Sequence, residues 1–328
     1  MRRGMIESTI RDRVLSPLRG TALCGLIFAL LMAGGCATTR PDGKALALLP
    51  PTYDNSLYSR HLPILVIHNP DSDYNRVGRI VIKKDRVAVD PDDPAVYVRT
   101  ENFSTPRGRY RNLIYRFHFK EVPFSLVPFH LTAGKNVGLI VVVTLDENDK
   151  TILFTTVHTC GCYLAFLPSR EIDPEMLPPG WPKNRQKILG ERLPAFIDGK
   201  KEGRILLDIR PATHRVMEAR WLDNEEAAGL RPGQRIKILP YSSLDDDRTG
   251  SIFVKKGLRR GYVKESHKPF EMLLMGWWTL DPFIGEDKDL GDHRNTGTRF
   301  YTSLKFWARE NSDMADFARF LKYWGWRL

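Results

Sequence analysis

Residues 137–168, VGLIVVVTLDENDKTILFTTVHTCGCYLAFLP, decide the fold class of this chain. Two apolar runs rich in Val, Ile, Thr and Phe flank a polar cluster, Asp-Glu-Asn-Asp, at residues 146–149. Apolar, β-branched runs on either side of a short polar turn are typical of a β-hairpin. We therefore expect a long hairpin near the middle of a sheet.

The second run begins at residue 151 and predicts a strand that is covered on both sides. Side chains alternate between the two faces of a strand, and both faces of this run are largely apolar. If the strand stays regular, His158, Cys160 and Cys162 lie in a row on one face. No other stretch of the sequence groups reactive side chains in this way, so these three are the first candidate site.

A disulfide between Cys160 and Cys162 is one interpretation of this row. In a regular strand, residues two apart have Cα atoms about 6.6 Å apart. A disulfide needs Cβ atoms about 3.5–4.5 Å apart. The bridge therefore requires a break in the strand, which Gly161 could permit.

Two further interpretations stay open. His158, Cys160 and Cys162 could bind zinc or copper, because thiolate and imidazole ligands suit these metals. A fourth ligand would then come from elsewhere, for example from His118 or His130. The plainest interpretation is that the thiols are small buried side chains beside a hydrogen-bonded core histidine.

The N-terminus has the features of an export signal. Arginines outnumber acidic residues in the first 20 positions, and an apolar run follows at residues 21–32, too short for a comfortable membrane span. The run ends in Ala33-Gly34-Gly35-Cys36. Small residues directly before a cysteine resemble the lipobox of bacterial lipoprotein precursors.

This resemblance covers residues 1–36 only, and no family is identified for the body of the chain. It implies that residues 1–35 are a signal peptide and that Cys36 carries the lipid, including palmitate. In that family an Asp after the cysteine retains the protein at the inner membrane. Ala37 stands there in this chain, which favours the outer membrane and a domain that faces the periplasm.

The charge of the chain limits its partners. The formal net charge is +11, and the signal removes +3, because it holds five arginines and two acidic residues. A mature charge of about +8 is compatible with three partners: the membrane that holds the lipid anchor, an anionic envelope polymer, or another envelope protein. Export argues against a nucleic-acid partner. The densest basic cluster is a candidate anionic-ligand site or a charged hairpin edge, and consists of Lys255, Lys256, Arg259, Arg260 and Lys264.

The rest of the chain predicts a mainly β fold, a sandwich or barrel-like antiparallel sheet with one or two C-terminal α-helices. Residues 36–60 are expected to be a tether and residues 61–270 a β-rich domain with a proline-rich connection near 168–185. Residues 271–328, a Trp-rich segment, an acidic loop and C-terminal helices, should pack on the same domain. Strands are expected at 64–68, 79–83, 95–100, 112–120, 204–209, 215–222, 235–239, 251–255 and 262–265.

Four local expectations can be compared with the structure. Residues 191–198 predict a short helix. Alternation within 115–120 places Arg116 and His118 toward water. The acidic residues of 281–299 could bind calcium, although a plain polar loop is the simpler interpretation. Apolar residues at helical spacing predict a C-terminal helix that starts near residue 311, ends before Gly325 and buries Leu321 and Trp324.

The sequence contains no nucleotide-binding loop, nucleophile elbow or metalloprotease motif. We therefore expect a lipid-anchored envelope protein with a binding or structural role. One alternative is a metal or redox protein that uses His158, Cys160 and Cys162. Another is an envelope hydrolase that acts on a cell-wall or surface polymer, with acid–base residues assembled from distant parts of the chain.

Overall fold

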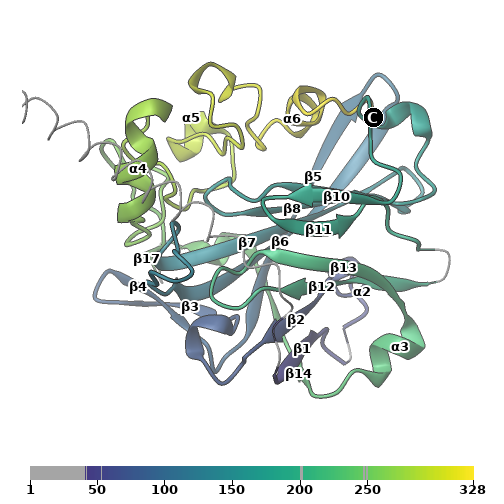
Figure 1. Cartoon of the computed structure of the whole chain (residues 1–328), viewed down its shortest axis with the longest axis horizontal. Helices are drawn as coiled ribbons and strands as arrows, with labels where there is room; N and C mark the ends of the chain where they lie inside the picture. The colour runs from purple at the N-terminus through teal and green to yellow at the C-terminus, as the bar shows by residue number, and fades with distance from the viewer. Residues whose placement is uncertain (1–40, 42, 53, 200–201, 247, 249) are drawn as a thin grey trace, which may run out of the picture.

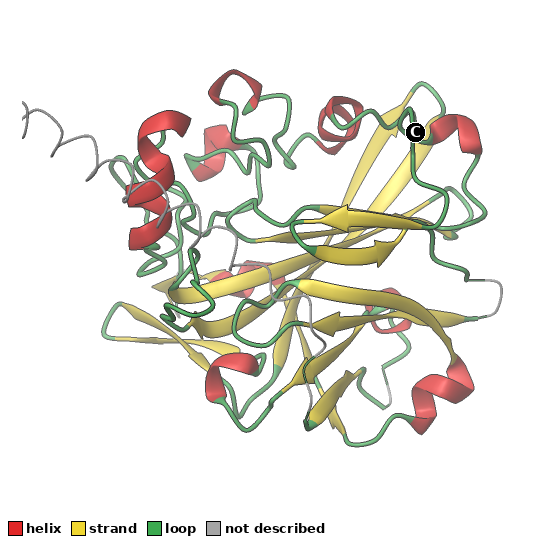
Figure 2. Ribbon diagram, in the orientation of Figure 1, coloured by secondary structure: helices red, strands yellow, loops and turns green. Residues whose placement is uncertain are grey.

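The structure, a computed structural model, describes residues 41, 43–52, 54–199, 202–246, 248 and 250–328. The fold is mainly β, as the sequence predicts, and Figures 1 and 2 show that it has three layers. A five-stranded sheet forms the first layer and a six-stranded sheet the second. The C-terminal segment with its helices covers the outer face of the six-stranded sheet.

The predicted hairpin lies inside the six-stranded sheet, whose order is β15-β5-β6-β7-β8-β9. Its two arms are β7 (Gly134–Leu145) and β8 (Thr151–His158), which pair antiparallel with Val143 opposite Phe154. The turn between the arms falls on the Asp-Glu-Asn-Asp cluster. The remaining strands are β5 (Ala95–Thr105), β6 (Gly108–Val122), β9 (Ala165–Pro168) and β15 (Lys237–Pro240).

The five-stranded sheet has the order β13-β12-β2-β1-β14. Its strands are β1 (Ala45–Leu49), β2 (Ile64–His68), β12 (Gly203–Ile209), β13 (Val216–Asp223) and β14 (Gly233–Arg235). The expectation that residues 36–60 form a tether is therefore wrong for β1, which pairs with a strand on each side. Its sequence, Ala-Leu-Ala-Leu-Leu, supplies the apolar side chains that an internal strand needs.

Period-two alternation explains why the six-stranded sheet is buried on both faces. In β8, Phe154 packs into the core between the two sheets, whereas Leu153 and Val157 point into a second core beneath the C-terminal segment. All three side chains are at most 3% exposed. Apolar residues on both faces of the central strands are what the sequence pattern predicts for a strand covered on each side.

Shorter elements complete the fold. The predicted helix at residues 191–198 is wrong, because β11 (Glu191–Pro194) forms a small hairpin with β10 (Arg185–Ile188). Two other small hairpins are β3 (Arg79–Lys83) with β4 (Arg86–Asp90), and β16 (Asp245–Asp246) with β17 (Gly250–Ser251). The α-helices are α2 (Leu57–His61), α3 (Asn224–Gly229), α4 (Pro269–Thr279), α5 (His293–Thr296) and α6 (Phe317–Tyr323). Among the described residues, no helix has the length and apolar character to cross a membrane.

The expectation that Arg116 and His118 face water is wrong, because both side chains are 0% exposed. The Arg116 guanidinium donates to the Tyr241 hydroxyl at 3.0 Å and to the Lys288 carbonyl at 2.9 Å. It also donates through Nε to His118 Nε2 at 3.1 Å. Segments more than a hundred residues downstream cover this face of β6. The alternation within the strand cannot predict this burial, because it reflects only the residues of the strand itself.

The C-terminal helix exists but begins later than predicted. It starts at Phe317, and the carboxylate of Asp316 accepts from the backbone N–H of Arg319 at 3.1 Å as an N-cap. Gly325 follows the helix with a φ of 88°, as expected for a residue that ends a helix. Leu321 is 2% exposed, as predicted, but Trp324 is 36% exposed, so its predicted burial is wrong.

We expect Leu321→Ala to destabilise the fold by about 2–5 kcal/mol, because truncating a buried leucine leaves a cavity in the packed interior. Chemical denaturation followed by circular dichroism measures the change. Lys322→Ala, an exposed neighbour on the same helix, is the control and should change stability by less than about 0.5 kcal/mol. An equal effect of both substitutions would contradict the role assigned to this helix face.

Candidate functional site

The candidate site begins where β8 ends. A tight turn follows His158, in which the Gly161 N–H donates to the His158 carbonyl at 2.8 Å. The His158 N–H in turn donates to the Cys162 carbonyl at 2.9 Å. Gly161 has a φ of 96°, and a Cβ there would overlap the carbonyl oxygen of Tyr301. The expectation of a regular strand through Cys162 is therefore wrong. The strand ends in a turn at Gly161, the residue at which the sequence allows a break.

The turn brings the two thiols together instead of spacing them along a strand. Both cysteines are free. Cys160 is 2% exposed and Cys162 is partly exposed. The Cys162 S–H has two acceptors within reach, the sulfur of Cys160 and the Glu271 carboxylate, with Sγ and Oε1 3.4 Å apart. The two cysteines thus form a neighbouring pair of thiols, one in a buried residue and one in a partly exposed residue.

The two thiols differ in acidity. The hydrogen bond that Cys162 donates lowers the pKa of Cys160, and the nearby Lys268 ammonium lowers it further. The same hydrogen bond, together with burial, raises the pKa of Cys162. Cys160 is therefore the sulfur that carries the negative charge more readily.

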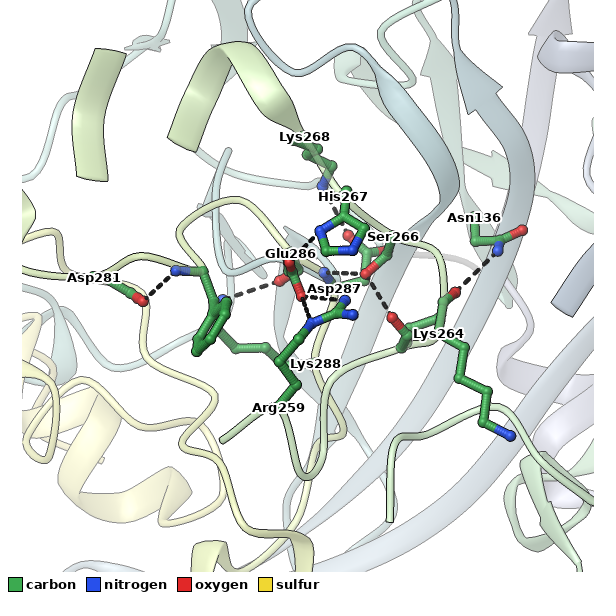
Figure 3. A network of polar contacts seen from close by, with 12 residues as sticks. Asn136, Arg259, Lys264, Ser266, His267, Lys268, Asp281, Glu286, Asp287 and Lys288 are labelled. Atoms are coloured by element: carbon green, nitrogen blue, oxygen red, sulfur yellow. Dashed lines mark hydrogen bonds and ion pairs between the residues drawn. The ribbon is translucent and has the colours of Figure 1, made fainter. Parts of the chain in front are cut away.

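A network of buried charges surrounds the turn, and Figure 3 shows its central part. Lys268 is 1% exposed, and its Nζ lies 2.8 Å from the Asp287 Oδ1, which is fully buried. Burial alone would lower the pKa of Lys268, but Asp287 and Cys160 raise it above the usual value, so the side chain stays charged. The Thr159 hydroxyl also donates to Asp287, which joins the network to the end of β8.

Lys288, Glu286 and Arg259 extend this network of charges (Figure 3). The Lys288 ammonium donates to the Cys160 carbonyl at 2.7 Å, so it fixes the backbone of the turn. Glu286 is fully buried, with the Arg259 Nη2 at 2.6 Å and the His267 Nδ1 at 2.7 Å from its carboxylate oxygens. The simpler expectation for the acidic segment 281–299, a plain polar loop, is wrong at these positions, because Glu286 and Asp287 are buried against protein cations.

The metal interpretation of the row His158, Cys160 and Cys162 gains no support from the arrangement. His158 Nε2 lies 3.1 Å from the His214 carbonyl, and His130 Nδ1 lies 2.8 Å from the Pro123 carbonyl. Across the part of the chain that the structure describes, no three His, Cys, Asp or Glu side chains are grouped so that they could hold a metal ion. Zinc or copper binding stays a prediction.

The predicted basic cluster is spread over several internal contacts. Arg259 forms an ion pair with the buried Glu286, and Arg260 donates to the Asn295 carbonyl at 2.5 Å. Lys255 pairs with Asp245, and Lys264 pairs with Asp85. Lys256 is exposed. Four of these five cations thus have a partner inside the protein, and the binding role of the cluster stays a prediction.

A separate cavity of about 690 Å³ bears on the hydrolase alternative. Its lining includes His61, Asp149 and Glu171. Asp149 pairs with Arg111 at 2.8 Å and Glu171 pairs with Lys150, whereas Glu202, a third carboxylate of the lining, is exposed. Because two of these three acids already form ion pairs, the cavity gives weaker support to acid–base chemistry than the two cysteines give to thiol chemistry.

Two histidines beneath the turn should make the fold sensitive to acid. Burial lowers the pKa of both His158 and His214 to about 3, against a usual 6.5. Between these pH values the unfolded chain binds a proton at each position that the folded chain does not. The free energy of unfolding should therefore be unaffected by them above pH 6.5 and fall below it by about 1.4 kcal/mol per pH unit for each histidine.

Urea denaturation at a series of pH values from 7.5 down to 4 measures this slope. His158→Gln keeps a donor near the Nε2 position and should reduce the slope by about 1.4 kcal/mol per pH unit, the share of one proton. Asn295→Gln, at an exposed position, changes no titratable group and should leave the slope unchanged. An unaltered slope in His158→Gln would show that His158 titrates normally in the folded state.

Comparisons with protein-family models, with curated proteins and with solved structures found no match for this chain. Its function is therefore inferred from the contacts of its own residues. The sequence pattern identifies His158, Cys160 and Cys162 but gives no signal that Lys268, Glu271 and Lys288 lie beside the two cysteines.

Proposed function

We propose that Cys160 and Cys162 form a reversible dithiol–disulfide couple in a protein that is held on the cell envelope by a lipid at Cys36. One observation carries the redox part, namely that the backbone turn after β8 breaks the strand between Cys160 and Cys162, so the two thiols are no longer held at strand spacing. A disulfide between residues two apart needs such a turn, because a regular strand holds them too far apart.

The proposed reaction moves two electrons. Oxidation breaks two S–H bonds and forms the Cys160–Cys162 bond, while a disulfide of another envelope protein accepts the two electrons and two protons and becomes a dithiol. Reduction by a protein dithiol reverses the step. An oxidising envelope compartment supplies partners of both kinds.

The two sulfurs have separate parts in the exchange. Cys162 is the more exposed of the two residues, so an incoming thiolate attacks its sulfur and forms the mixed disulfide there. Cys160 then leaves as the thiolate, which the Lys268 ammonium stabilises. A leaving thiol of lower pKa speeds this step. The buried carboxylates and ammonium groups hold both sulfurs in position without taking part in the electron transfer.

The redox part can be tested on a single peptide. Trypsin cuts after Lys150 and Arg170, and the peptide between them contains Cys160 and Cys162 and no other cysteine. The protein is equilibrated in glutathione buffers of different potential, unfolded, alkylated and digested. We expect the two thiols to disappear together, with a tenfold change in the ratio for each step of about 30 mV, as a two-electron couple requires.

Cys160→Ser and Cys162→Ser are the matched controls for this measurement, and each should keep one alkylated cysteine at every potential. A wild-type peptide that stays doubly alkylated in oxidised glutathione would refute the couple. Elemental analysis of the same sample addresses the alternative, since about one equivalent of zinc or copper would instead favour a metal centre.

The envelope part is tested by labelling cells with palmitate. The expected result is labelled wild-type protein and an unlabelled Cys36→Ser variant, because the resemblance to lipoprotein precursors assigns the lipid to this cysteine. Cys24→Ser is the control, since Cys24 lies in the segment that would be removed, and it should be labelled like the wild type. Equal labelling of all three proteins would exclude Cys36 as the lipid site.

A further inference from the structure

Large hydrophobic side chains are exposed at one part of the molecule. Most of those that the described residues expose belong to three segments, residues 124–127, helix α4 with the following residue, and residues 304–307. We call these side chains the aromatic surface. They are Phe124, Leu126, Val127, Leu273, Trp277, Trp278, Leu280, Leu304, Phe306 and Trp307.

Two sets of contacts place the other segments next to helix α4. At the start of α4, Phe270 stacks on Phe124 with ring centroids 5.2 Å apart, and it meets Phe129 edge-on at 5.6 Å. At the end of α4, Arg309 donates to the Thr279 carbonyl at 2.7 Å and so fixes residues 304–307 beside the helix. In Figure 1, α4 lies at an edge of the molecule, outside both sheets.

The exposure is too large for ordinary surface residues. Leu273 is 73% exposed, Trp277 is 75% exposed and Trp307 is 67% exposed. Isolated exposed hydrophobic residues are common on soluble proteins, but a contiguous group of this size marks a surface that contacts a membrane or another protein.

We propose that the aromatic surface rests on the anionic phospholipid bilayer to which the protein is attached. This inference depends on the lipid at Cys36 that is part of the proposed function. Ala45, the first residue of β1, is only the ninth residue after Cys36. Nine residues span at most about 30 Å even when fully extended, so the anchor keeps the domain beside the bilayer and one of its faces close to the lipid.

The chemistry of the aromatic surface fits the lipid interface. Tryptophan and phenylalanine side chains collect at the boundary between headgroups and acyl chains. Lys305 is exposed between Leu304 and Phe306, so a cation lies within the apolar group. The formal net charge of about +8 that remains after removal of residues 1–35 adds attraction toward anionic headgroups. A lipid surface is therefore favoured over a protein partner.

Fluorescence quenching by brominated lipids tests the contact directly. The lipidated protein is reconstituted in vesicles of phosphatidylethanolamine and phosphatidylglycerol with brominated acyl chains. We expect quenching of the wild type. Combined replacement of Trp277, Trp278 and Trp307 by Phe should reduce the quenched signal at least about threefold, because these rings would be the ones at acyl-chain depth. Trp181→Phe is the control, since Trp181 packs against Trp326 elsewhere, and it should leave the quenching unchanged.

Two outcomes would overturn the proposal without touching the lipid anchor. One is a wild-type protein that is attached through its lipid but shows no quenching. The other is protection of these tryptophans from aqueous acrylamide without quenching by brominated lipid, which would indicate a protein partner or a second copy of the chain. Failure of the anchor itself is separately visible as the absence of palmitate at Cys36.

Discussion

The buried ion pair between Lys268 and Asp287 is the interaction on which the site depends. Both side chains are almost fully inaccessible, and their atoms lie 2.8 Å apart. Removing one partner of such a pair typically destabilises a protein by about 3–5 kcal/mol, because the other charge is left buried. Lys268 precedes α4, Asp287 follows it, and Thr159 joins the pair to the end of β8. The pair thus positions a helix, a turn and a cation beside Cys160 together.

The central hairpin could be predicted because its information is local. Two apolar runs with period-two alternation and a polar turn between them determine β7 and β8 with little help from the rest of the chain. The same local signals mark Gly325 as the residue that ends α6. They fail for β1, which looks like a linker in sequence because Pro50 and Pro51 follow it directly and its apolar run has only five residues.

The site could be predicted only in part, because its contacts join distant segments. Cys160 and Cys162 were visible as a pair, and Gly161 was visible as a possible break. The sequence could not show that the Tyr301 carbonyl occupies the space beside Gly161. Arg116 illustrates the same limit. The alternation within its strand predicts a side chain that faces water, whereas the guanidinium is buried and donates to the Tyr241 hydroxyl and the Lys288 carbonyl. Local periodicity describes one strand, whereas burial depends on what later folds over it.

Helix α4 physically links the dithiol with the aromatic surface. Glu271 in its first turn is the acceptor next to Cys162, and the neighbouring Phe270 packs against Phe124 and Phe129. In the proposed disulfide state Cys162 has no proton to donate, so the Glu271 Oε1 loses that donor. The other oxygen of Glu271, Oε2, already has no hydrogen-bond partner among the described residues. A buried carboxylate that loses a donor favours movement toward water, where its oxygens regain hydrogen bonds. Such a movement would shift the first turn of α4, and with it Phe270, which packs against Phe124 and Phe129.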